Sequence, residues 1–169
     1  LVDLRKQHAR SALGYFWIVL SQFVNIAGIA FVWGVLFKQD IREFFPYISA
    51  GVISWNFLSG SLNESTRSFV SNAPIIQNFK FPAWVFLAQM VVRNGIVLIY
   101  ATLVHMTLFI LFGGTLTFAH LLIPLVYAIA ILLMIQSGIL LAYIGARFRD
   151  FAPAFGNLVY LFFLITPII

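Results

Sequence analysis

The sequence has no cysteine and very few charged residues. Without cysteine, neither disulfide bonds nor thiolate metal sites can form. Charged residues make up 9% of the 169 residues, whereas a soluble domain carries about a quarter. Hydrophobic residues reach 62% and the mean hydropathy is +1.01. This balance indicates an integral membrane protein.

The sequence also lacks the motifs of soluble enzymes. It has no G-x-x-x-x-G-K-[ST] segment, so we expect no P-loop that holds ATP on this chain. It has no H-E-x-x-H, and His8, His105 and His120 lie in separate segments without ligand spacing. No D-x-D pair and no nucleophile beside a base occurs. We therefore expect no catalytic residue, no metal site and no cofactor on this chain.

Five apolar runs predict an all-α integral membrane fold, because about 20 apolar residues cross roughly 30 Å of hydrocarbon. The third run is long enough for a helix of about 45 Å, which must tilt or protrude from the bilayer. The chain starts without Met and ends inside an apolar run, so we expect it to be part of a longer protein. The expected spans are residues 15–37, 45–62, 83–112, 120–146 and 151–169.

Residues 1–13 are too polar to cross the membrane. Apolar residues fall near one helical face, although the basic residues are spread around the helix. This pattern favours an interfacial helix at the level of the lipid headgroups. A solvated basic tail is the alternative.

A short segment with polar edges, residues 72–82 (NAPIIQNFKFP), separates the second and third spans. Pro74 favours the start of a helix, since its missing N–H is not needed in the first turn. Pro82 moves Phe81 out of helical geometry. The segment therefore predicts about two helical turns outside the bilayer.

The basic residues are distributed unevenly between the two sides of the predicted membrane. With the N-terminus inside, only Lys38 and Arg42 lie outside, and Asp40 and Glu43 offset them. This asymmetry predicts a cytoplasmic N-terminus, and it places the 72–82 segment and the 147–150 turn in the cytoplasm. The charges form no basic face, so a nucleic-acid partner is not expected. The inside residues are Arg5, Lys6, Arg10, Arg67, Lys80, Arg147 and Arg149.

Polar residues on the predicted helices allow two interpretations. Small and polar side chains mediate helix packing in lipid, which explains most of them. Arg93 is different, because an arginine deep in a span costs about 2.5–3.5 kcal/mol. It should face a partner, a wet cavity or a phosphate, or it snorkels to the inner interface. The sequence leaves packing and function equally open for this residue.

Several sequence runs resemble the membrane subunit of ABC-2 polysaccharide exporters. They are LRKQHARSALGYFW (4–17), AGVISWNF (50–57), SFVSNA (68–73) and FKFP (79–82). Further on, RFRD (147–150) and FFLITP (162–167) resemble the short cytoplasmic turn and the end of the fifth span in that family. The resemblance covers nearly the whole chain in the same order. Members export O-antigen, capsule or wall teichoic acid.

The resemblance implies a transport subunit rather than an enzyme. It implies six spans per subunit, of which the sixth is absent here, and an interfacial helix at the cytoplasmic face. It also implies a homodimer with two cytoplasmic ATPase subunits, which hold the ATP and magnesium. The expected location is the bacterial cytoplasmic membrane, in contact with membrane lipid.

The resemblance also implies roles for individual residues. Two groups would couple to the ATPase: Asn72, Ala73, Pro74, Ile75, Ile76 and Gln77 in the insert, and Arg149 and Asp150 in the turn. The substrate would be an undecaprenyl-diphosphate-linked glycan, whose pyrophosphate Arg5, Lys6, Arg10 and Arg93 could attract. Tyr15, Phe16, Trp17 and Trp55 could stack on sugars in the channel. An interfacial aromatic belt is the alternative for these rings.

Two other kinds of transporter remain open. The first is an ABC-2 exporter of a drug, haem or small lipid, which is related to the polysaccharide exporters. Only the Trp55-Asn56 pair and the 147–150 turn argue against it. A secondary transporter would require an internal repeat and a titratable pair near the middle of the membrane. The sequence shows no clear repeat, and Glu64 is the single carboxylate near a span that could pair with Arg93.

Overall fold

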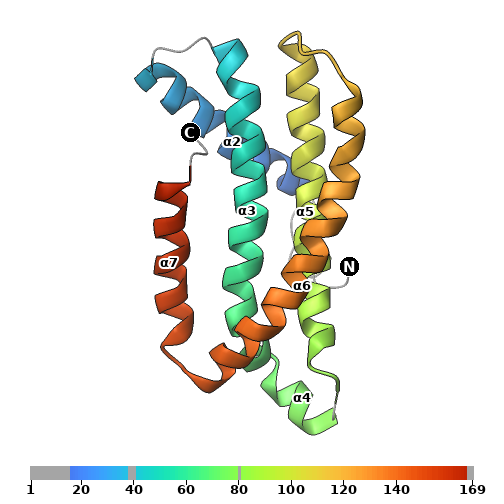
Figure 1. Cartoon of the computed structure of the whole chain (residues 1–169), viewed down its shortest axis with the longest axis vertical. Helices are drawn as coiled ribbons and strands as arrows, with labels where there is room; N and C mark the ends of the chain where they lie inside the picture. The colour runs from blue at the N-terminus through green and yellow to red at the C-terminus, as the bar shows by residue number, and fades with distance from the viewer. Residues whose placement is uncertain (1–15, 38–40, 80, 167–169) are drawn as a thin grey trace. The chain divides into compact units, whose positions relative to one another are not determined.

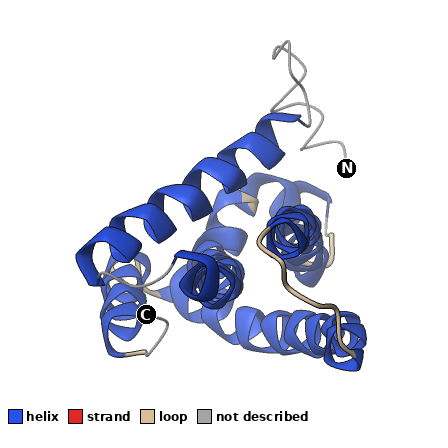
Figure 2. Ribbon diagram, turned by 90° about the horizontal axis from the view of Figure 1, so that it is seen from above, coloured by secondary structure: helices blue, strands red, loops and turns tan. Residues whose placement is uncertain are grey.

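The computed structural model describes residues 16–37, 41–79 and 81–166. Within these residues the chain is helical, with loops and turns but no strand (Figure 2). This confirms the all-α prediction. The helices are α2 (Phe16–Phe37), α3 (Ile41–Ser71), α4 (Ala73–Phe79), α5 (Trp84–Leu111), α6 (Ile123–Arg147) and α7 (Phe151–Ile165), with a 3₁₀ turn η1 (Phe118–Leu122) before α6. The interfacial helix expected at residues 1–13 lies outside the described residues.

The contacts within the chain define two compact units. Of the described residues, the first unit comprises 16–37, 41–54 and 96–118, and the second comprises 55–79, 81–95 and 119–166. Helices α3 and α5 therefore each contribute one part to each unit. The segments with predicted coupling roles, α4 and the turn after α6, belong to the second unit.

In the first unit, α3 and α5 are joined by a ring contact and a buried hydrogen bond. The rings of Phe45 and Phe112 lie with their centroids 5.2 Å apart. Ser49 Oγ and His105 Nδ1 are 2.6 Å apart, and both residues are buried. Pairing these two polar groups avoids the cost of leaving either one unsatisfied in an apolar environment.

In the second unit, apolar side chains from three helices form one core. Phe69 of α3, Leu87, Met90 and Val91 of α5, and Ala142 of α6 are all buried and in contact. Partly buried hydrophobic residues of α4 and α6 pack against this cluster. This core therefore holds α3, α5 and α6 together next to α4, whose Ile76 packs against it.

Helices α3 and α6 approach each other closely because α6 has small residues at the contact. Gly138, Ala142 and Gly145 are buried along one face of α6. A Cβ atom at Gly138 would lie 2.7 Å from Ser65 Oγ, and one at Gly145 would overlap the backbone carbonyl of Thr66. Small residues permit such close packing of helices in lipid.

Helix α3 extends beyond the predicted span 45–62 at both ends. It begins at Ile41, and Pro46 falls in its second turn, where the proline removes a single backbone hydrogen bond. Beyond Leu62, hydroxyl groups bond back to carbonyls of the same helix, as in Ser65 Oγ to the Ser61 carbonyl at 2.6 Å. Burial against α6 then stabilises a stretch whose sequence is polar.

Among the described residues, two helical segments are long and apolar enough to cross a bilayer, namely Trp84–Leu111 and Phe118–Arg147. Only 6% of the most apolar stretch of Phe118–Arg147 is buried within the protein, which is unlike the core helix of a soluble domain. The stretch Leu20–Ile29 within α2 and the helix Phe151–Ile165 are apolar but shorter. The structure is therefore compatible with a membrane protein, and the number of five spans stays a prediction.

Candidate functional site

Helix α4 is a seven-residue helix that connects α3 to α5, and Figure 1 shows it at the turn between them. It lies inside the predicted segment 72–82, with Pro74 in its first turn and Pro82 after its end. Phe81 has no helical conformation, as expected for a residue before proline. Its ring packs 5.7 Å from that of Phe86, at the start of α5.

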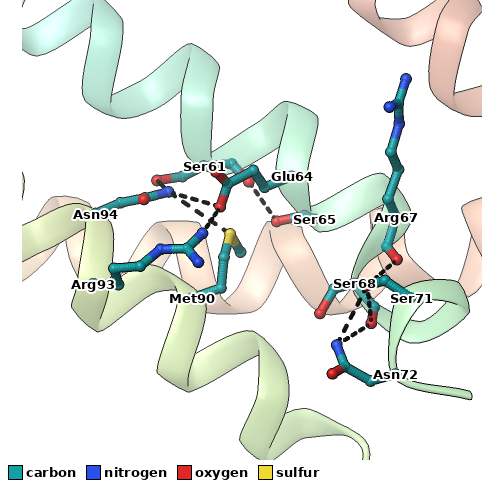
Figure 3. Close-up of polar contacts among 10 residues, drawn as sticks. All are labelled: Ser61, Glu64, Ser65, Arg67, Ser68, Ser71, Asn72, Met90, Arg93 and Asn94. Carbon is teal, nitrogen blue, oxygen red and sulfur yellow. Dashed lines mark hydrogen bonds and ion pairs between the residues drawn. The ribbon is translucent and has the colours of Figure 1, made fainter. Parts of the chain in front are cut away.

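Asn72 joins α3 to α4 through both its backbone and its side chain. Its carbonyl accepts hydrogen bonds from the N–H groups of Ile75 and Ile76, each at 3.0 Å, and so starts α4. Its side-chain Nδ2 donates to the Ser68 carbonyl at 2.8 Å, in the last turns of α3. A contact of 3.4 Å to Ser71 Oγ accompanies it (Figure 3). One residue therefore ties the direction of α4 to the end of α3.

The two faces of α4 differ in their surroundings. Ile76 is partly buried and packs against the core of the second unit. Ile75 is 45% exposed, and Pro74 and Gln77 are also exposed. A short helix that is anchored on one side and open on the other is suited to contact a second protein. The structure brings the predicted insert residues together in this arrangement, and their coupling role stays a prediction.

Arg149 and Asp150 lie between α6 and α7, and both side chains are exposed. Asp150 occupies the position before the first residue of α7, but its side chain makes no capping hydrogen bond there. Both residues share the second unit with α4.

Arg93 forms an ion pair with Glu64, from α5 to α3 (Figure 3). Asn94 Nδ2 adds hydrogen bonds to Ser61 Oγ at 3.3 Å and to Glu64 Oε2 at 3.4 Å. Arg93 lies nine residues after Trp84, about 14 Å along α5. The carboxylate offsets the arginine charge, so the charge that looked isolated in the sequence has a partner. Its contact with a pyrophosphate stays a prediction.

We name Ser61, Glu64, Arg93 and Asn94 the polar cluster. The sequence already showed Glu64 as a carboxylate near a span, which is the one signal that could have identified the pair. Asn94 and Ser61 were missed, because nothing in the sequence shows which faces of α3 and α5 meet. The side chains of Arg93 and Glu64 are 28% and 46% exposed.

The remaining predicted site residues are placed only in part. Arg5, Lys6, Arg10 and Tyr15 lie outside the described residues. Phe16 is the first residue of α2, and the structure does not describe its side chain. Trp17 is 52% exposed. Trp55 is half-buried, with its ring 5.6 Å from that of Phe163, so it takes part in packing between α3 and α7.

Long apolar helices, two of them connected by a short helix with one open face, are compatible with an all-α membrane protein. No model of a known protein family matches the chain. Curated permease proteins are similar to it. One from Myxococcus xanthus, the O-antigen export system permease protein RfbA, is 24% identical over 167 residues, which cover 99% of this chain and 64% of the relative.

Two proteins of the same name from Klebsiella pneumoniae are 24% and 22% identical over 168 residues. Each alignment covers 99% of this chain and 65% of the relative. These relatives confirm the resemblance to the permeases of ABC-2 O-antigen exporters. The chain spans somewhat less than two thirds of the length of the relatives it matches.

Proposed function

We propose that this protein is the channel-forming membrane subunit of an ATP-driven exporter of undecaprenyl-diphosphate-linked polysaccharide. The observation that carries the proposal is the similarity over 99% of the chain to permeases named for O-antigen export. ATP would be hydrolysed by two separate cytoplasmic subunits bound to a homodimer of this protein in the inner membrane.

Helix α4 is the proposed joint between the ATPase and the membrane helices. Its open face, with Ile75 and Gln77, would contact the ATPase subunit. Movement of α4 would reach α3 through the Asn72–Ser68 hydrogen bond and the core of the second unit through Ile76. Arg149 and Asp150 offer a second contact on the same unit.

The substrate would be taken up at the cytoplasmic interface. Arg5, Lys6 and Arg10 would attract the pyrophosphate, because basic residues near the surface attract anionic groups. Arg93 would be a second contact, but only if the phosphate shares or displaces Glu64. Tyr15, Phe16 and Trp17 would offer rings to the sugars near this interface, whereas Trp55 would do so only on its exposed edge.

A genetic test decides between this proposal and the nearest alternative. The full-length protein and its ATPase are expressed in a strain that makes a lipid-linked O-antigen but has no exporter for it. We expect the glycan to reach the cell surface. If the glycan stays in the cytoplasmic leaflet while efflux of a drug or small lipid is gained, the protein belongs to the other kind of ABC-2 exporter.

A further inference from the structure

The second unit contains a pocket of about 440 Å³, and Arg149 is the lining residue that already has a role in the proposed function. The pocket lies where the end of α3, the end of α6 and the start of α7 meet. Its polar lining consists of Thr66, Arg67, Ser71 and Arg149. Small and apolar groups complete the wall.

The charge at this pocket is positive. Both guanidinium groups belong to exposed residues, and no carboxylate lines the pocket. In the part of the chain that the structure describes, neither arginine forms an ion pair, and Figure 3 shows the Arg67 side chain extending away from Glu64. Asp150 is the nearest acidic residue in sequence, and it is outside the lining. The surroundings therefore favour an anion.

The first turn of α7 borders the pocket through Ala152 and Pro153. It offers few donors to an anion, because Pro153 has no backbone N–H and the N–H of Phe151 donates to the Phe148 carbonyl. Guanidinium groups bind phosphate oxygens with paired hydrogen bonds. The two arginines therefore supply the donors for an anion, because the hydroxyl groups of Thr66 and Ser71 donate to backbone carbonyls of α3.

The remaining wall indicates which anion fits. Small and apolar groups stand beside the arginines, so the pocket can hold a phosphate together with adjoining hydrocarbon. This step rests on the proposed function, in which the more basic side of the protein faces the cytoplasm. Both arginines then lie at the cytoplasmic leaflet, where anionic headgroups lie. We propose that the Arg67–Arg149 pocket binds the phosphate group of an anionic membrane phospholipid.

The pocket is also next to the joint with α4. Ser71 lines it and contacts the side chain of Asn72, which starts α4. A bound phospholipid would therefore lie beside the residues that set the direction of the coupling helix.

The test measures binding of phosphatidylglycerol to the full-length protein in a neutral detergent, without ATPase or glycan, with phosphatidylcholine as the reference lipid. We expect wild-type protein to prefer phosphatidylglycerol. The double variant R67Q/R149Q should bind it at least about tenfold more weakly, because two charge-assisted contacts are lost. R147Q removes a neighbouring arginine that does not line the pocket, and it should stay within about twofold of wild type.

Unchanged phosphatidylglycerol affinity in R67Q/R149Q would overturn the proposal, whether or not this variant still binds the ATPase. Displacement of the lipid by an equal concentration of inorganic phosphate would identify a soluble-anion site instead. R67K/R149K keeps both charges and should retain most of the affinity. A loss equal to that of the Gln variant would assign the effect to damaged packing. Because no transport is measured, this result is independent of whether the glycan is exported.

Discussion

Arg93 lies in a mainly apolar helix that contains no Asp, Glu or Lys, and its surroundings explain how the chain tolerates it. Glu64 supplies the opposite charge, and Asn94 connects that carboxylate to Ser61. A charged residue within a membrane helix is usually paired or faces a polar cavity. The polar cluster provides such pairing between α3 and α5, on either side of the short helix that connects them.

Removing one member of the Arg93–Glu64 pair should destabilise the protein more than removing both. E64Q and R93Q each leave a charge without its partner, which we expect to cost about 1–3 kcal/mol. The double variant should recover part of that, with a coupling free energy of about 0.5–3 kcal/mol. Unfolding of the full-length protein in mixed micelles by SDS measures these differences. Strictly additive losses would show that the pair contributes no interaction.

The basic residues near the N-terminus give a second prediction, for three side chains that are changed together. Changing Arg5, Lys6 and Arg10 to Gln should raise the KM for the lipid-linked glycan by up to about a hundredfold, at about 1 kcal/mol for each charge near the surface. The matched control changes Lys38 and Arg42, which lie on the predicted outer side. Export kinetics that are equal in both variants would remove the pyrophosphate role.

Helix α4 is short, so its direction depends on what fixes its first turn. Asn72 performs this role with its carbonyl and with its Nδ2 hydrogen bond to Ser68. N72A retains the carbonyl but loses the side-chain bond. We expect stimulation of the ATPase by the protein to fall roughly two- to tenfold, in line with one lost hydrogen bond.

The control for that variant is N157A, which truncates an exposed asparagine on α7. The amount of ATPase bound should be unchanged in both variants. If N72A stimulated the ATPase as fully as wild type, the Asn72–Ser68 bond would have no part in coupling.

The contact between α3 and α6 gives opposite expectations for the same substitution at two glycines. G145A places a Cβ against the Thr66 carbonyl and should destabilise the protein by about 1–3 kcal/mol. G60A meets no atom within 4 Å in the middle of α3, so it should stabilise by about 0.5–1 kcal/mol. Unfolding in mixed micelles measures both. A neutral G145A would contradict the close approach of the two helices.

Much of the helical layout could be predicted from hydropathy and proline positions. The predicted spans 83–112 and 15–37 are close to α5 and α2. Pro74 lies in the first turn of α4, and Pro82 follows the end of that helix. The end of α3 could not be predicted, because its polar residues look like a loop. Their hydroxyl groups are satisfied within the helix and buried by α6, and only tertiary contact shows that.

The site was predictable to a smaller degree. Local sequence identified α4, since two prolines and a change in polarity are local signals. The partner of Arg93 lies 29 residues away on another helix, and the pocket arginines Arg67 and Arg149 lie 82 positions apart. Which residues meet across helices depends on the rotation of each helix about its axis. Sequence periodicity does not define this rotation here, because the helices are apolar on most faces.

At the scale of the whole molecule, the proposed ATPase contacts, α4 and the turn after α6, both belong to the second unit. Helix α4 would receive movement from the ATPase, and the core beside it connects α3, α5 and α6. The chain spans 64–65% of the relatives' length, so transport itself must be measured on the full-length protein. The central claim is that ATP hydrolysis drives export through α4.

Inside-out vesicles with the full-length protein and its ATPase test that claim most directly. The measurement is ATP-dependent uptake of an undecaprenyl-diphosphate-linked glycan, for wild type and for a variant in which residues 72–81 are replaced by a Gly/Ser linker of equal length. We predict uptake and glycan-stimulated ATP hydrolysis for wild type, and loss of both for the linker variant with the protein still in the membrane. Equal uptake by the linker variant would contradict the account.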